Sequence, residues 1–230
     1  MLSLLRLLAT VCRGDASSRP STMLMILGGS RAREQAAVES LGLFQDVKLV
    51  LLSSGSMDGF ELYKSVVGSI PSSRPMAVVA DRAAVDTVTN CTTVCHAIAA
   101  TKITSVVVVT EHAHLRRASL IAIIVFGALG ITVRPHGVSA GTCSIPPESW
   151  SRCWRDALRA LLFVISGFDG STVAHWVYPM RAADSHQARK SKLSLQEQLG
   201  RGLTIVEGLE QRPAMDSRPS RGSSQVHLIS

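Results

Sequence analysis

The run SVVVVT at residues 105–110, β-branched and without polar alternation, is the feature that most restricts what this chain can fold into. A strand with one face in water alternates apolar and polar side chains, so an unbroken apolar run indicates a strand buried on both faces. Such strands occur in parallel sheets that helices cover on both sides. The chain is therefore expected to form a layered unit with a sheet in its middle.

Four other apolar runs are shorter and lie at 23–27, 48–52, 76–80 and 131–133. Helix-compatible segments separate the runs, at 31–41, 86–100 and 114–124. Regular alternation of strand and helix predicts an α/β fold of the Rossmann-like, doubly wound kind, with a mainly five-stranded parallel sheet and flanking helices. The first and fourth strands are expected to be neighbours.

A closing helix is predicted after Pro146 and Pro147. Large apolar residues recur there at helical spacing, namely Trp150, Trp154, Leu158, Leu161, Leu162 and Ile165. A stripe of this kind usually faces the core, so it is expected to pack on the sheet.

The two ends of the chain differ from its middle in composition. Residues 1–22 are rich in Leu and Ser and carry three Arg against one Asp, which fits either an organellar transit peptide or a disordered start. A transit peptide would direct the protein to a plastid or mitochondrion; otherwise a cytoplasmic location is expected. Residues 23–179 form the predicted domain, and 180–230 a polar, basic, largely disordered tail.

The formal net charge of +7 does not predict nucleic-acid binding, because the excess is concentrated at the ends. Residues 180–230 carry eight Lys and Arg against five Asp and Glu, whereas a nucleic-acid-binding domain gathers basic residues on its folded face. The longest apolar stretch, 118–133, is interrupted by Gly127 and Gly130 and is shorter than the roughly 20 residues of a membrane span. Five cysteines without a CxxC motif are expected to be reduced.

Candidate ligand-binding residues follow the predicted strands, because ligands of open α/β sheets bind at the carboxyl ends of the strands. Gly28 and Gly29 follow the first run and allow close backbone approach, and the helix start behind them favours an anion. The remaining candidates, grouped by the strand that precedes them, are Arg33; Ser54 and Gly55; Asp86, Thr87 and Asn90; and Thr110, His114 and Arg117.

His114 is the candidate for proton transfer, because histidine exchanges a proton near neutral pH. Arg117, one turn further along the same helix, is suited to bidentate binding of a phosphate or carboxylate. His112 and His114 together are an alternative metal pair, although no third ligand is evident. A serine nucleophile is not expected, since Gly55 to Gly59 does not have the GxSxG spacing.

Taken in order, the segments LGGSRARE, SSGS, DTVTN and VTEHAHLRRA resemble the YdcF-like domain that SanA and ElyC share. The later segment PPESWSRCWRDALRALLFVISG is similar to the cyanobacterial and plastid-lineage branch of that family. The resemblance covers about residues 23–170. It implies a Rossmann-like domain, S-adenosylmethionine as a potential cofactor, and a link to envelope maintenance. The N-terminal membrane anchor of many bacterial relatives is not recognisable in this sequence.

The leading hypothesis is a domain that binds a nucleotide-like or phosphorylated, anionic small molecule, with transferase or hydrolase activity as an option. Gly28, Gly29, Arg33 and Arg117 would hold the anion, and Asp86 or Asn90 would bind a hydroxyl group. The alternatives are a non-catalytic accessory protein of an organelle or membrane surface, and a metal-dependent hydrolase.

Overall fold

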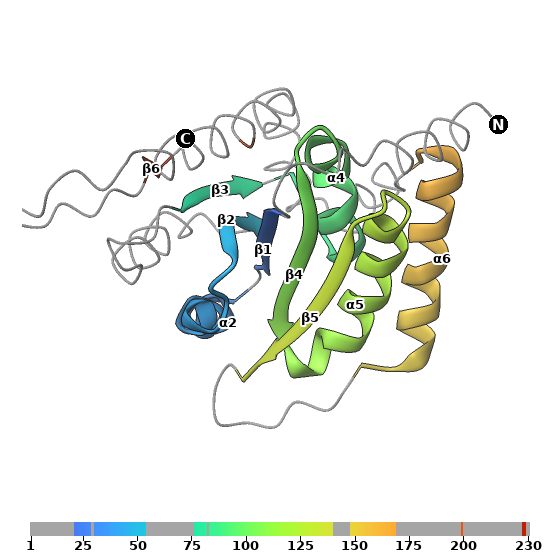
Figure 1. The fold of residues 1–230 in the computed structure, drawn as a ribbon. Coiled ribbons are helices and arrows are strands. Elements are labelled where there is room, and N and C mark those ends of the chain that lie inside the picture. Colours follow the sequence, from blue (N-terminus) through green and yellow to red (C-terminus); the bar gives the residue numbers. More distant parts are fainter. Residues whose placement is uncertain are drawn as a thin grey trace, which may run out of the picture.

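A computed structural model describes residues 21–28, 30–53, 76–81, 83–139, 148–168, 199 and 227–228 (Figure 1). The strands are β1 (Ser21–Leu27), β2 (Val47–Ser53), β3 (Ala77–Asp81), β4 (Ile103–Glu111), β5 (Thr132–Val138) and the two-residue β6 (His227–Leu228). The helices are α2 (Arg31–Glu39), the short 3-10 helix η1 (Ser40–Leu43), α4 (Thr87–Ala99), α5 (His112–Gly127) and α6 (Trp150–Ser166).

The sheet is parallel, and its strand order is β5-β4-β1-β2-β3-β6. The predicted Rossmann-like α/β fold is therefore confirmed. β1 pairs with β4 on one side and with β2 on the other, so the first and fourth strands are neighbours as predicted. Between β1 and β4 the order of the strands reverses, and this switch point is where open α/β sheets bind ligands.

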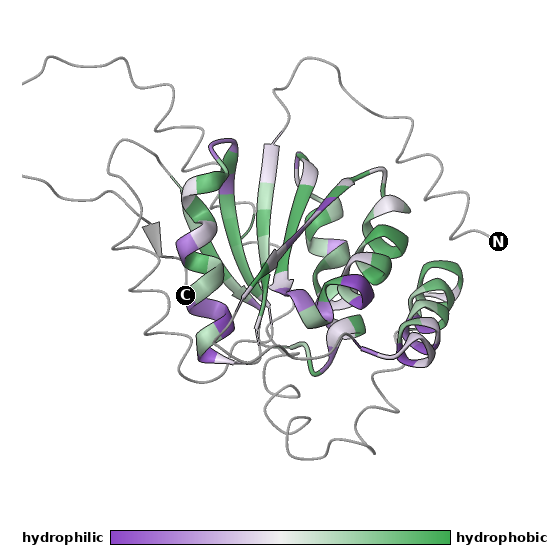
Figure 2. Cartoon of the chain, turned by 90° about the horizontal axis from the view of Figure 1, so that it is seen from below, coloured by the Kyte–Doolittle hydropathy of each residue, from purple (hydrophilic) through white to green (hydrophobic). Residues whose placement is uncertain are grey.

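Helices cover both faces of the sheet, and the alternation of side chains along the strands gives each face its own core. Met23, Met25 and Leu27 point to the face covered by α4 and α5, whereas Leu24 and Ile26 point to the face covered by α2. The middle strands are accordingly apolar along most of their length (Figure 2). Burial on both faces explains why the run at 105–110 shows no polar alternation.

β5 extends five residues beyond the predicted end of the fifth run, to Val138. Its sequence TVRPHGV contains Pro135, which has no N–H to donate to a sheet. Among the described strands β5 lies at the edge, paired only with β4, and there a proline is tolerated. The predicted strand was too short because the second half of β5 is exposed at the edge of the sheet and therefore contains polar residues.

The closing helix α6 forms as predicted, but the prediction of its buried face was wrong. The large residues Trp150, Trp154, Leu158, Leu161, Leu162 and Ile165 are all exposed. Small residues form the buried stripe instead, with Cys153, Ala157 and Ala160 beside Phe163. The packing partners of α6 are α5 and α4 rather than the sheet. Small side chains allow these helices to approach closely.

Two described parts of the C-terminal stretch contact the domain. Leu199 is fully buried in the core cluster that contains Phe163 and Phe126. β6 pairs in parallel with β3 at the other edge of the sheet. Residues 1–20 and the rest of 169–230 lie outside the described residues, so the predicted transit peptide and the predicted disordered tail stay predictions. Among the described helices, none has the length and apolar character needed to cross a membrane.

Candidate functional site

The predicted site residues that the structure describes follow or end β1, β3 and β4. Gly28 follows β1, Asn90 lies in the first turn of α4, and Thr110 is buried near the end of β4. His114 and Arg117 lie on the first turns of α5, which starts directly after β4. Gly29, Ser54 and Gly55 lie outside the described residues.

Arg33 lies on α2 beside the turn that follows β1. Its Nη1 donates a hydrogen bond of 3.2 Å to the carbonyl oxygen of Gly28, and its Nε lies 3.7 Å from Glu111 Oε2 at the end of β4. Ser30 caps α2 by accepting a hydrogen bond from the Arg33 N–H. Burial lowers the pKa of Arg33, while the nearby Glu111 carboxylate opposes this effect. The guanidinium thus bridges the two strands at the switch point.

Ser53 and Asn90 connect β2 to α4 on the other side of β1. The Ser53 hydroxyl donates to Asn90 Oδ1 at 3.1 Å, and the Gly28 N–H donates to the Ser53 carbonyl at 2.8 Å. Both side chains are buried. Asn90 is therefore held in place within the fold, directly beside the backbone that leaves β1.

His114 and Arg117 share one carboxylate, that of Glu148. His114 Nδ1 lies 3.0 Å from Glu148 Oε1, and Arg117 Nε lies 2.6 Å from Glu148 Oε2. The Glu148 backbone N–H donates to the carbonyl of Ala113, which fixes the residue at the start of α5. The Arg117 contact is an ion pair, and neither contact has the alignment of a hydrogen bond. The His114 side chain is 28% exposed, so solvent and small molecules can reach it.

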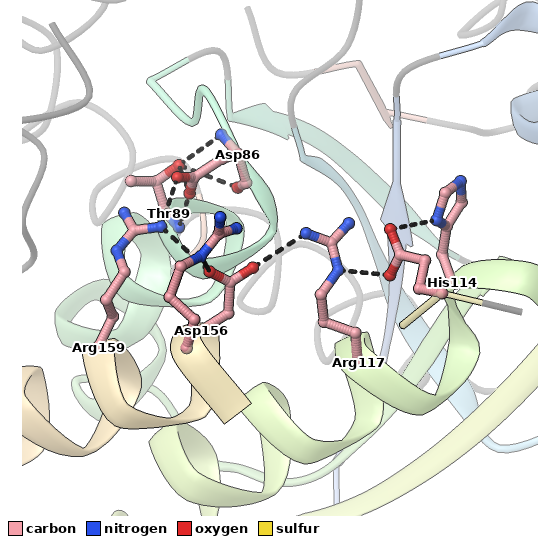
Figure 3. A network of polar contacts seen from close by, with 8 residues as sticks. Asp86, Thr89, His114, Arg117, Asp156 and Arg159 are labelled. Carbon is pink, nitrogen blue, oxygen red and sulfur yellow. Dashed lines mark hydrogen bonds and ion pairs between the residues drawn. The ribbon is translucent and has the colours of Figure 1, made fainter. Parts of the chain in front are cut away.

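A second carboxylate, Asp156 on α6, contacts Arg117 from the other side (Figure 3). Arg117 Nη1 donates to Asp156 Oδ2 at 3.0 Å, and Arg155 Nε donates to Asp156 Oδ1 at 2.9 Å. Asp156 is 2% exposed. Burial alone would raise its pKa, but the hydrogen bonds from Arg155 and Arg117 outweigh burial and lower the pKa of Asp156.

Arg159 extends the chain of ion pairs to α4. Its Nη1 donates to Asp86 Oδ2 at 2.9 Å and lies 3.6 Å from Asp156 Oδ1. Figure 3 shows the resulting sequence of contacts from His114 through Arg117 to Asp86. We call this set the ion network; its members are His114, Glu148, Arg117, Asp156, Arg155, Arg159 and Asp86. Three arginines thus meet three carboxylates between α4, α5 and α6, and the charges largely compensate one another.

Asp86 is the N-cap of α4, as its place before the helix predicted. Its side chain accepts from the Thr89 N–H at 2.8 Å, and the Thr89 hydroxyl accepts from the Asp86 N–H at 2.8 Å, which completes a capping box. Thr87 is the first residue of the helix. Asp86 is therefore occupied by a helix cap and an ion pair.

Replacing Asp86 with alanine is expected to lower the free energy of unfolding by about 1–2 kcal/mol, because the cap and the Arg159 contact are lost together. Chemical denaturation of the purified variant measures this. Thr87→Ala is the matched control, with an expected change within about 0.5 kcal/mol. Equal losses for the two variants would show that the capping box contributes little.

The two histidines of the HxH segment diverge. The His112 ring lies against Gly137 on β5, where even a methyl group in place of the Gly137 hydrogen would collide with it. His114 instead contacts Glu148 before α6. Among the described residues no cluster of three or more His, Cys, Asp or Glu side chains is arranged to hold a metal ion.

Four carboxylate or hydroxyl residues at this edge were missed from the sequence: Ser53, Glu111, Glu148 and Asp156. Ser53 and Glu111 are the last residues of their strands, and a search that included strand ends would have found them. Glu148 and Asp156 follow no strand of the described sheet directly. Only the packing of α6 on α5 brings them to Arg117, and no sequence spacing indicates that contact.

Comparison of the chain with models of protein families, with curated protein sequences and with solved structures gave no match.

Proposed function

We propose that the domain binds an anionic, nucleotide-like small molecule at the carboxyl edge of the sheet, between the ends of β1 and β4. The observation that carries the proposal is the strand order, because it places the Gly28 turn, Arg33 and the start of α5 together at the switch point. The start of α2 behind Gly28 presents backbone N–H groups that favour a phosphate or carboxylate. The resemblance to YdcF-like domains supports a binding site at the same edge of the sheet. It also makes S-adenosylmethionine one ligand to test.

His114 is the proposed proton-transfer residue if the bound molecule reacts. A carboxylate against one imidazole nitrogen fixes the orientation of the ring, and Glu148 lies in this place at Nδ1. The other nitrogen is then available to a ligand. Contacts of this kind are often poorly aligned before the ligand binds and tighten afterwards, which agrees with the geometry of the His114 pair.

Arg117 has a different proposed role. Its Nε and Nη1 are each within 3.0 Å of a carboxylate oxygen, so an incoming anion would compete with both Glu148 and Asp156. We propose that Arg117 positions Glu148 and, through it, His114. Arg33 is the better candidate for contact with the anion, because its longer separation of 3.7 Å from Glu111 makes that ion pair weaker.

The test is a thermal-shift measurement with S-adenosylmethionine, AMP and inorganic phosphate, together with native mass spectrometry for a retained small molecule. A ligand at 100 times its Kd stabilises the folded state by about 2.7 kcal/mol, and this is expected to raise the Tm by several degrees. Arg33→Gln should weaken binding at least about tenfold, the loss of one hydrogen bond to a charged group.

Arg31→Gln is the matched control, since Arg31 begins the same helix and is exposed. Equal binding by Arg33→Gln and wild type, or a loss that Arg31→Gln reproduces, would contradict the proposed site. His114→Gln should keep ligand binding and lose any turnover of the ligand.

A further inference from the structure

The outward face of α6 exposes a continuous set of large apolar side chains. Among the described residues nine large hydrophobic side chains are exposed, and seven of them belong to α6 or follow it directly. Each of the seven is between 46% and 66% exposed. We call them the α6 stripe: Trp150, Trp154, Leu158, Leu161, Leu162, Ile165 and Phe168. Monomeric proteins rarely expose apolar surface of this extent unless another surface binds it.

Helical geometry makes the α6 stripe a single surface. At 3.6 residues per turn, its six members within the helix occupy an arc of about 120° around the helix axis. This arc lies directly beside the buried face of α6. The helix has 17 residues and is about 25 Å long. It lies at the outside of the domain, next to α5, where nothing else in the described part of the chain covers it (Figures 1 and 2).

Arginines border the α6 stripe on both sides. Arg116 of α5 places its guanidinium carbon 4.4 Å from the centre of the Trp150 ring, at one edge. Arg152 and Arg155 lie at the other edge and are exposed. The acid of α6, Asp156, is buried, so the helix exposes positive charge and no carboxylate.

We propose that the α6 stripe binds the surface of a membrane that contains anionic lipids. Helices that lie in a membrane interface combine Trp, Leu and Phe on one side with Arg or Lys beside them, and the rings of Trp and the stems of Arg suit the boundary between headgroups and acyl chains. The arginines at its edges would contact the phosphate groups, while the α6 stripe enters the outer acyl region.

Charge favours this occupant over a second copy of the chain. Two copies that pair their α6 stripes around a two-fold axis bring arginines of both copies to the rim of one interface. No exposed acid on α6 compensates them. An anionic bilayer supplies the opposite charge along the whole helix.

The experiment is flotation of the full-length protein with vesicles of phosphatidylcholine alone and of phosphatidylcholine with 30% phosphatidylserine, a composition chosen within the anionic range of natural leaflets. Wild type is expected to float with the anionic vesicles and much less with the neutral ones. The double variant Trp154→Ser, Leu158→Ser should bind at least about tenfold more weakly, because each side chain loses its burial in the acyl region. Arg152→Gln should weaken binding to anionic vesicles only.

Leu43→Ser is the matched control, because Leu43 is 69% exposed on η1 and lies outside the α6 stripe. Circular dichroism verifies that each variant is folded. Equal flotation of the double variant and wild type, or no flotation of wild type, would overturn the proposal. A wild-type dimer in sedimentation velocity that the double variant abolishes, without vesicle binding, would assign the surface to a second copy instead.

Discussion

Asp156→Ala is expected to lower the free energy of unfolding by about 3–5 kcal/mol, the loss typical of removing one partner from a buried ion pair. Asp156 is 2% exposed and contacts Arg117 and Arg155 at 3.0 and 2.9 Å. Without its carboxylate, Arg117 keeps a positive charge in a buried place with one partner fewer. Chemical denaturation, with the slope checked for two-state behaviour, measures the change.

Asp46→Ala is the control for this substitution. Asp46 also contacts an arginine, Arg134 at 2.6 Å, but both side chains are about half exposed. Water screens this pair, so its share of the loss is at most about 1 kcal/mol. The hydrogen bond of 2.8 Å from the Thr22 hydroxyl to Asp46 adds about 1 kcal/mol, so the total stays below that for Asp156→Ala. Similar losses for the two variants would mean that the burial of Asp156 does not strengthen its ion pairs.

The effect of Asp156 should also depend on pH. Its pKa is lowered in the folded state, because the hydrogen bonds from Arg155 and Arg117 outweigh burial. A lowered folded pKa gives stability that is complete above the unfolded pKa of about 3.9 and is lost as the pH falls through the folded value. The difference between wild type and Asp156→Asn should therefore be constant near neutral pH and shrink below about pH 4. A difference that grew in acid would contradict this sign.

The sheet could be predicted from the sequence because burial on both faces leaves a strong local signal. Each central strand is an unbroken apolar run, and helix caps such as Asp86 mark where the next element begins. The predicted neighbours β1 and β4 follow from the general rules for alternating strands and helices. β5 was underestimated because its exposed edge position removes the apolar signal.

Only those residues of the candidate site that directly follow a strand could be predicted from the sequence. Arg33, His114 and Arg117 follow strands, so the strand-end rule found them. The carboxylates that contact His114 and Arg117 come from Glu148 and Asp156, whose positions depend on how α6 packs. That packing was predicted with the wrong face, since size alone selects Trp150 and Trp154 for the core. Close contact between helices favours small residues, and the periodicity of the sequence does not show whether the small or the large apolar residues of a helix are buried.

Arg117→Ala is expected to reduce the free energy of unfolding by about 3–5 kcal/mol as well, since two carboxylates lose a common partner. The Glu148 and Asp156 side chains are 9% and 2% exposed, so water cannot easily replace the guanidinium. Arg116→Ala is the neighbouring control. Arg116 is exposed and stacks on Trp150, a contact worth about 0.5–1 kcal/mol at an exposed position.

A double-mutant cycle separates the two roles that Arg117 could have. If it positions Glu148, then adding Glu148→Gln to Arg117→Ala should cost less than Glu148→Gln costs alone, with a coupling of about 0.5–3 kcal/mol. Stability near that of wild type for Arg117→Ala, together with weaker binding of phosphate or AMP, would contradict the positioning role. Arg117 would then be a ligand-binding residue, and the ion pairs with Glu148 and Asp156 would be contacts that the ligand displaces.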